Sequence, residues 1–122
     1  MNHKLMIIYL LALATLVADT HADTNNAAEA DIPVIVITAS RFVYSPNQIT
    51  IKKGQTVLLE IQATDTQHGF SIPDLGVRVD AIPGEKKTIK ITPTKNGRFV
   101  FYCDIFCGSG HEQMAGEIIV ET

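Results

Sequence analysis

The chain has 122 residues with ten basic and thirteen acidic side chains, which give a formal net charge of −3 at pH 7. This mild acidity offers no electrostatic footprint for nucleic acid, and no segment is repeated along the chain. We therefore expect a single domain that does not bind nucleic acid.

Residues 1–22 have the layout of a secretory signal peptide. A basic start at Lys4 precedes an apolar run from Leu5 to Ala18, and small or polar residues lead to an expected cleavage after Ala22. The rival interpretation is an uncut membrane anchor, but the run has fourteen residues and a span needs about 20. We expect an exported, soluble, periplasmic protein without a membrane span after cleavage.

Residues 23–31 are polar without an apolar period, and we interpret them as a flexible lead-in to a domain over residues 32–122. The first run of that domain, IPVIVIT at 32–38, is continuously apolar and rich in β-branched residues. This composition predicts a buried strand. A turn at Ser45-Pro46-Asn47 then precedes a second run, in which Ile49 and Ile51 alternate with polar residues.

The turn at Gly54 leads to TVLLEIQA at 56–63, where apolar and polar residues alternate and predict a half-buried strand. The stretch HGFSIP at 68–73 predicts a short strand. Alternation resumes at 87–91 after a Pro83-Gly84 turn, continues in GRFVFYC at 97–103, and ends with a strand over 116–121.

Seven or eight short strands without a sustained helical period predict an all-β fold, an antiparallel Greek-key sandwich or small barrel. The segment CDIFCGSGHEQM at 103–114 then falls in the connection between the last two strands. His68 lies 35 residues before Cys103 and must be brought to this connection by the fold.

This connection gathers nearly all the soft metal ligands of the mature chain. After cleavage the only histidines, cysteines and methionine left are His68, Cys103, Cys107, His111 and Met114. A disulfide between the cysteines would explain neither the histidines nor the methionine, and its short loop would give little entropic stabilisation. Zinc accepts cysteine and histidine, but it has no use for the thioether.

Thiolates, imidazoles and a thioether together form a donor set that suits copper. A mononuclear blue-copper site would use two histidines, one cysteine and a methionine, which leaves one cysteine over. Because a thiolate can bridge two metals, two coppers would account for the second cysteine. One histidine would then remain to bind each metal.

The chain resembles the CuA domain of cytochrome c oxidase subunit II and nitrous oxide reductase, within the cupredoxin superfamily. The resemblance is carried by DTQHGF at 65–70 and by CDIFCGSGHEQM, which follows the pattern C-x-x-x-C-G-x-x-H-x-x-M. It extends through the flanks SPNQITIKKGQTV, PGEKKTIKI and GEIIV, from about residue 40 to residue 121.

The resemblance implies a dinuclear copper centre and a role for each ligand. Cys103 and Cys107 would bridge the two ions, and His68 and His111 would each bind one. Met114 would be a weak ligand of one copper, and the backbone carbonyl of Ile105 a weak ligand of the other. Gly108 and Gly110 are expected to let the chain fold tightly around the metals.

The sequence also departs from oxidase subunits. Ile105 replaces a glutamate that helps to hold magnesium in those proteins, no membrane helix is evident before the domain, and the chain has no tryptophan to receive electrons. Phe70, Tyr44 and Phe106 are alternative entry points for electrons. We expect a free-standing electron carrier, not an enzyme on its own, between a c-type cytochrome or similar donor and a terminal oxidase or reductase.

Three other functions stay open. The same ligands could serve a copper chaperone that delivers the metal to an oxidase under assembly, or a soluble component of an oxidase-like complex. A thiol–disulfide oxidoreductase would use Cys103 and Cys107 alone and would not need the histidines or the methionine.

Overall fold

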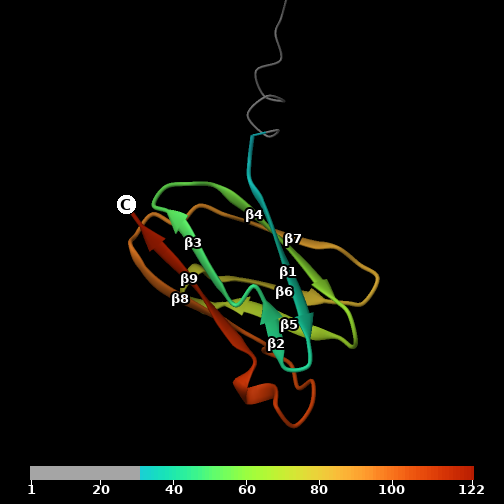
Figure 1. The fold of residues 1–122 in the computed structure, drawn as a ribbon. Helices are drawn as coiled ribbons and strands as arrows, with labels where there is room; N and C mark the ends of the chain where they lie inside the picture. Colours follow the sequence, from blue (N-terminus) through green and yellow to red (C-terminus); the bar gives the residue numbers. More distant parts are fainter. Residues whose placement is uncertain (1–30) are drawn as a thin grey trace, which may run out of the picture.

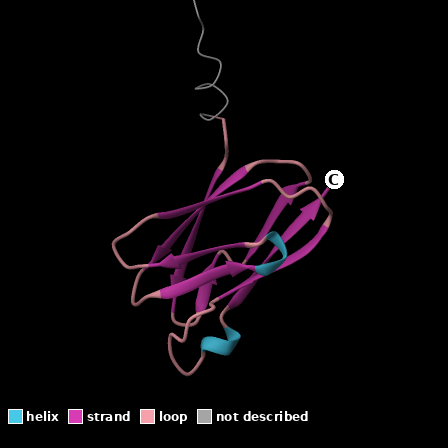
Figure 2. Ribbon diagram, turned by 180° about the vertical axis from the view of Figure 1, so that it is seen from behind, coloured by secondary structure: helices cyan, strands magenta, loops and turns pink. Residues whose placement is uncertain are grey.

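The computed structural model describes residues 31–122. The predicted signal peptide and nearly all of the lead-in lie outside the described residues, so these two predictions remain untested. In the described part, nine strands form two sheets that face each other (Figures 1 and 2). The strands are β1 (Val34–Ser40), β2 (Val43–Ser45), β3 (Gln48–Lys52), β4 (Val57–Ala63), β5 (His68–Ile72), β6 (Val77–Ala81), β7 (Lys87–Ile91), β8 (Gly97–Tyr102) and β9 (Ala115–Glu121).

The predicted all-β sandwich is confirmed, and the structure refines two details of it. The described residues hold nine strands, where seven or eight were expected. Strand order is β2-β1-β4-β7 in one sheet and β3-β9-β8-β5-β6 in the other. The pairs β1–β4 and β3–β9 are parallel, whereas the remaining pairs are antiparallel. Alternation along a strand marks its buried face but carries no information on the direction of its neighbour.

Between the sheets lies the core, built from the alternating residues that the sequence indicates. In β4 the side chains of Val57, Leu59, Ile61 and Ala63 are all buried. The first strand, predicted to be buried, is buried on its inner face only, and its outer face is exposed. Val34 there is 55% exposed, while Ile37 on the inner face is fully buried.

Three aromatic rings fill the core beneath one end of the sandwich. Tyr44 packs edge-on against Phe70 and Phe101, with ring centroids 5.6 and 5.3 Å apart. The Tyr44 hydroxyl donates a hydrogen bond of 2.5 Å to the carbonyl oxygen of Gly69. These contacts hold β2 against β5, so the segment next to His68 rests on a packed aromatic cluster.

The connection between β8 and β9 projects from this same end. It includes a short 3-10 helix, η2 (His111–Gln113), and lies beside the turn that joins β1 to β2 (Figure 1). The start of β1 and the C-terminus lie at the opposite end of the sandwich (Figure 1). Among residues 31–122, no helix is both long and apolar enough to cross a bilayer.

Candidate metal centre

The predicted ligands come from two segments of the chain, a strand of one sheet and a connection between two other strands of that sheet. His68 is the first residue of β5, and the other five residues belong to the connection between β8 and β9, which we call the ligand loop (residues 103–114). Strands β5 and β8 are neighbours in that sheet, so Cys103, directly after β8, is brought next to β5. The main-chain NH of Gly69 donates to the Cys103 sulfur over 3.4 Å.

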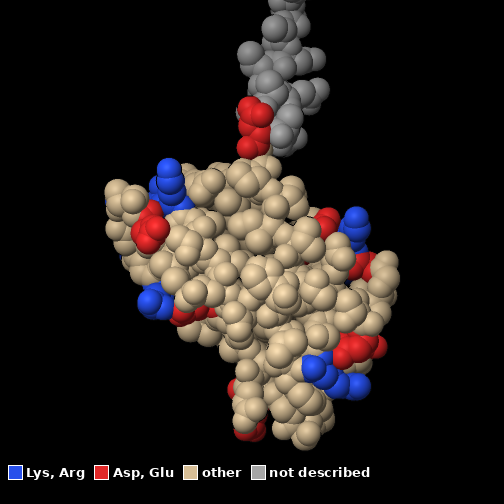
Figure 3. All heavy atoms as spheres, viewed as in Figure 1, with Lys and Arg blue, Asp and Glu red and all other residues tan. Residues whose placement is uncertain are grey.

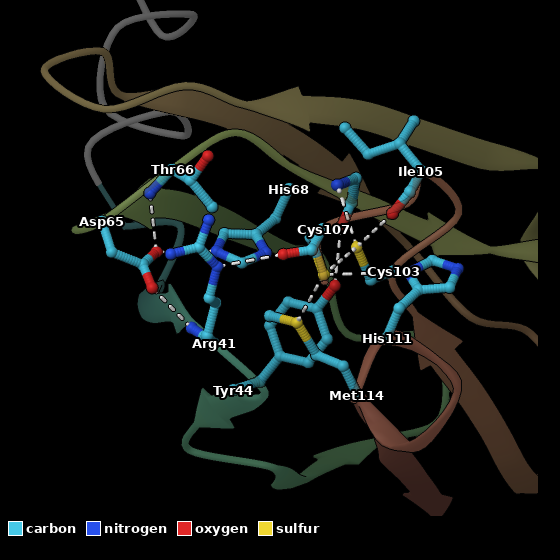
Figure 4. Close-up of polar contacts among 11 residues, drawn as sticks. Arg41, Tyr44, Asp65, Thr66, His68, Cys103, Ile105, Cys107, His111 and Met114 are labelled. Carbon is cyan, nitrogen blue, oxygen red and sulfur yellow. Dashed lines mark hydrogen bonds and ion pairs between the residues drawn. The ribbon is translucent and has the colours of Figure 1, made fainter. Parts of the chain in front are cut away.

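Sulfur, nitrogen and oxygen donors meet inside this loop (Figure 4). The Sγ atoms of Cys103 and Cys107 are 3.6 Å apart. Cys107 Sγ lies 3.7 Å from His111 Nδ1 and 3.9 Å from Met114 Sδ. The carbonyl oxygen of Ile105 lies 3.1 Å from Cys103 Sγ.

The donor atoms of His68, Cys103 and Cys107 all lie within 4.8 Å of one another, and all three residues are buried. His111 is half-buried and stands outside this tight group, although its ring is close to Cys107. Both cysteines are free thiols. The structure therefore brings all six predicted residues to one place, with His111 at its outer edge.

His68 carries a feature that fits a metal ligand. Its Nε2 is paired with the Asp65 carboxylate at 2.7 Å, while its buried Nδ1 has no hydrogen-bond partner. An unpaired buried polar atom is costly, and a metal ion is one partner that would satisfy it. A histidine that binds metal through one nitrogen usually pairs the other with a carboxylate or a carbonyl.

Asp65 was quoted in the sequence motif, but sequence reasoning gave it no role. Burial opposes ionisation of this carboxyl, yet hydrogen bonds from the Arg41 main chain, the His68 ring and the Thr66 main chain outweigh it. They lower the pKa of Asp65 to about 2. Its place three residues before His68 is the signal that could have identified it.

Burial also acts on the Cys107 thiol. It raises the pKa of Cys107 to about 11, and the neighbouring Cys103 adds to the effect. The thiolate form needed for metal binding is thus disfavoured until a cation arrives.

Two side chains outside the ligand loop, Arg78 and Phe42, lie against it. Asp104 forms a two-pronged ion pair with Arg78 of β6, at 2.5 and 2.9 Å, and this pair lowers the pKa of Asp104. On the other side, the ring of Phe42 lies against the loop glycines. A Cβ atom on Gly108 or Gly110 would come within 2.8 or 2.5 Å of that ring.

Of the three aromatic residues considered as entry points for electrons, Phe106 alone is exposed. Its side chain is 81% exposed and its ring centroid lies 5.9 Å from that of His111. Tyr44 and Phe70 are buried beneath the site.

These features define a small two-sheet β protein whose thiol, imidazole and thioether groups converge at one end. Residues 6–120 match the cupredoxin-like domain family, and the chain belongs to that family. The fold and the family agree with the resemblance that the sequence motifs indicated.

The relatives extend this result. The chain is 32% identical over 87 residues to cytochrome c oxidase subunit 2 of Thermus thermophilus, a match that covers 71% of this chain and 64% of that protein. It is 30% identical over 91 residues to nitrous-oxide reductase of Pseudomonas fluorescens, covering 71% of this chain and 14% of the reductase. The chain thus spans less than two thirds of the length of these relatives.

Among solved structures, the periplasmic domain of subunit II of cytochrome oxidase (CoxB) of Bradyrhizobium japonicum has a similar fold. The TM-score is 0.67 at 22% identity, over 72% of this chain and 83% of that one. The predicted resemblance to oxidase subunit II and to nitrous-oxide reductase is confirmed.

Proposed function

We propose that this protein transfers single electrons through a dinuclear CuA centre held by the ligand loop and His68. The observation that carries the proposal is the convergence of two thiols, two imidazoles and a thioether at one end of the sandwich. These side chains include no carboxylate, the ligand that magnesium and calcium prefer. Soft sulfur donors favour copper over those two metals.

Each residue has a defined task in this proposal. Cys103 and Cys107 would bridge the ions, and His68 and His111 would each hold one of them. Met114 would be a weak ligand of one copper ion, and the Ile105 carbonyl a weak ligand of the other. When bound, two copper ions that share both thiolates supply a reversible one-electron redox couple.

The protein's own contribution is rigidity and exclusion of water. His68, Cys103, Cys107 and Met114 are buried, so solvent has little access to the donors. The Asp65 carboxylate orients the His68 ring, and the strands on either side fix the loop ends. A site that cannot rearrange needs little reorganisation when an electron arrives or leaves.

The partners proposed are a c-type cytochrome or similar donor and a terminal oxidase or reductase, in the periplasm. Phe106 supports this, because its exposed ring beside His111 gives an apolar contact next to the proposed ligands. On the face shown in Figure 3, acidic and basic side chains of the described residues are interspersed, with no patch of one sign.

Electron paramagnetic resonance of the copper-loaded protein tests this proposal. We expect hyperfine splitting by two equivalent copper nuclei, lost in Cys103→Ser and in Cys107→Ser. Ile105→Val should leave the spectrum nearly unchanged, because only its carbonyl is used. Splitting by a single copper nucleus would contradict the dinuclear centre and favour copper delivery.

A further inference from the structure

The turn that joins β1 to β2 touches both segments that supply the proposed ligands. The main-chain NH of Arg41 donates to Asp65 Oδ2 at 2.7 Å, and the other oxygen of that carboxylate holds His68. The Nε atom of the Arg41 side chain donates to the carbonyl oxygen of Cys107 at 3.0 Å. One residue is thus tied to both sides of the site (Figure 4).

The next residue strengthens this contact. The Phe42 ring packs on the main chain of Gly108 and Gly110, directly after Cys107. The Arg41 hydrogen bond therefore acts on a part of the ligand loop that is already held from one side. Without it, the Cys107 carbonyl would lose a charge-assisted donor in a partly buried position.

We propose that Arg41 is a positioning residue of the metal centre, which fixes the Cys107 side of the ligand loop and places a positive charge next to the main chain of Cys107. The part that concerns copper rests on the proposed function. The part that concerns the loop rests on the hydrogen bonds alone and applies without metal.

The charge has a predictable effect on the redox couple. A cation close to the site stabilises the state that carries one more electron, because that state is the more negative one. Arg41 should therefore raise the reduction potential. Lysine would keep the charge, but it lacks the planar group whose Nε donates to the carbonyl here.

The test compares three variants with the wild type. Arg41→Gln removes the charge, Arg41→Lys keeps it, and both leave the main-chain NH that binds Asp65. Arg98→Gln is the matched control. Arg98 pairs with Glu117 of β9 and lies near the start of β8, whereas Cys103 directly follows the end of that strand. Three quantities are measured: amide hydrogen exchange of residues 103–114 in the metal-free protein, copper affinity by chelator competition, and reduction potential.

In the metal-free protein we expect exchange of the ligand loop to be about tenfold faster in Arg41→Gln, since a hydrogen bond from a charged group contributes about 1.5 kcal/mol. Copper affinity should fall about tenfold, as for other groups that orient a ligand. The potential should fall in Arg41→Gln and stay near the wild-type value in Arg41→Lys. Arg98→Gln should change none of the three.

Unchanged loop exchange in both Arg41 variants would overturn the positioning role. An equal potential in Arg41→Gln and the wild type would overturn the electrostatic role. If Arg41→Gln does not fold, the exchange rates of Arg41→Lys decide the positioning role. If the wild-type protein itself binds no copper, the proposed function fails, while the exchange measurement still decides whether Arg41 holds the loop.

Discussion

His68 shows how one residue is prepared for its role by its neighbours. The Asp65 carboxylate fixes one ring nitrogen and leaves the buried Nδ1 for a metal. The main-chain NH groups of Arg41 and Thr66 in turn hold Asp65, so the ring is oriented before any metal binds. Such orientation keeps the entropic cost of metal binding low.

Replacing Asp65 tests this arrangement. We expect Asp65→Ala to lower copper affinity about tenfold, because the His68 ring loses the group that orients it. Asp65→Asn should retain part of the affinity, since its amide oxygen can still accept from Nε2. Chelator competition measures the change, with Asp74→Ala as an exposed acidic control. Equal affinities in Asp65→Ala and the wild type would contradict the role.

The raised pKa of Cys107 predicts a pH dependence of copper binding. With a pKa of about 11 in the metal-free protein, this thiol is protonated at neutral pH, so copper must displace its proton. Affinity should therefore rise with pH, about tenfold per pH unit for each proton released, until the pH reaches the thiol pKa. Titration calorimetry in buffers of different ionisation enthalpy counts the protons, and a count of zero would refute this mechanism.

At the scale of elements, the ligand loop is shaped by side chains outside it as well as by its own sequence. Gly110 has a φ of −98°, which any residue can adopt, so the requirement for glycine comes from close packing, and the atoms nearest to an added Cβ belong to the Phe42 ring. The sequence predicted that glycines were needed here. It could not show that Phe42, on a distant turn, was the reason.

This explanation can be tested with a pair of substitutions. Gly110→Ala should lower the free energy of unfolding of the metal-free protein by about 1–3 kcal/mol, because the new methyl group has no room beside the ring. Adding Phe42→Ala should remove the clash, so the double variant should lose less stability than the two single changes together. Urea denaturation of all three variants measures this, and simple additivity would show that Phe42 is not the obstacle.

Particular residues show how far the sequence could predict these elements. Alternation placed Leu59 and Ile61 in the core, and the sequence motif placed five of the six candidate ligands in the connection between β8 and β9. The parallel pairing of β1 with β4 was not predictable, because alternation is the same for either direction. Nor was Arg41, which lies 66 residues before the carbonyl group that it binds.

At the scale of the whole molecule, the site joins two parts of one sheet. His68 belongs to β5, and the remaining proposed ligands belong to the connection that leads into β9. A metal bound by both would link these segments directly. Unfolding would then have to break the metal bonds, so binding energy becomes folding energy.

Copper should therefore stabilise the fold as a whole. With free copper at about a thousandfold excess over the Kd, the expected gain is about 4 kcal/mol. Thermal unfolding should show a higher Tm with copper than without, and the gain should shrink in Cys103→Ser. An unchanged Tm for the wild type would show that the metal does not bind the folded state preferentially.

The start of β1 and the C-terminus lie at the end of the sandwich opposite the ligand loop (Figure 1). A surface, a lipid anchor or a second domain attached at either point would leave the ligand loop directed outward. The domain could thus be fixed to an electrode through a C-terminal tag with Phe106 facing solution. In that orientation the proposed electron transfer to a dissolved partner would pass through the same face as in the free protein.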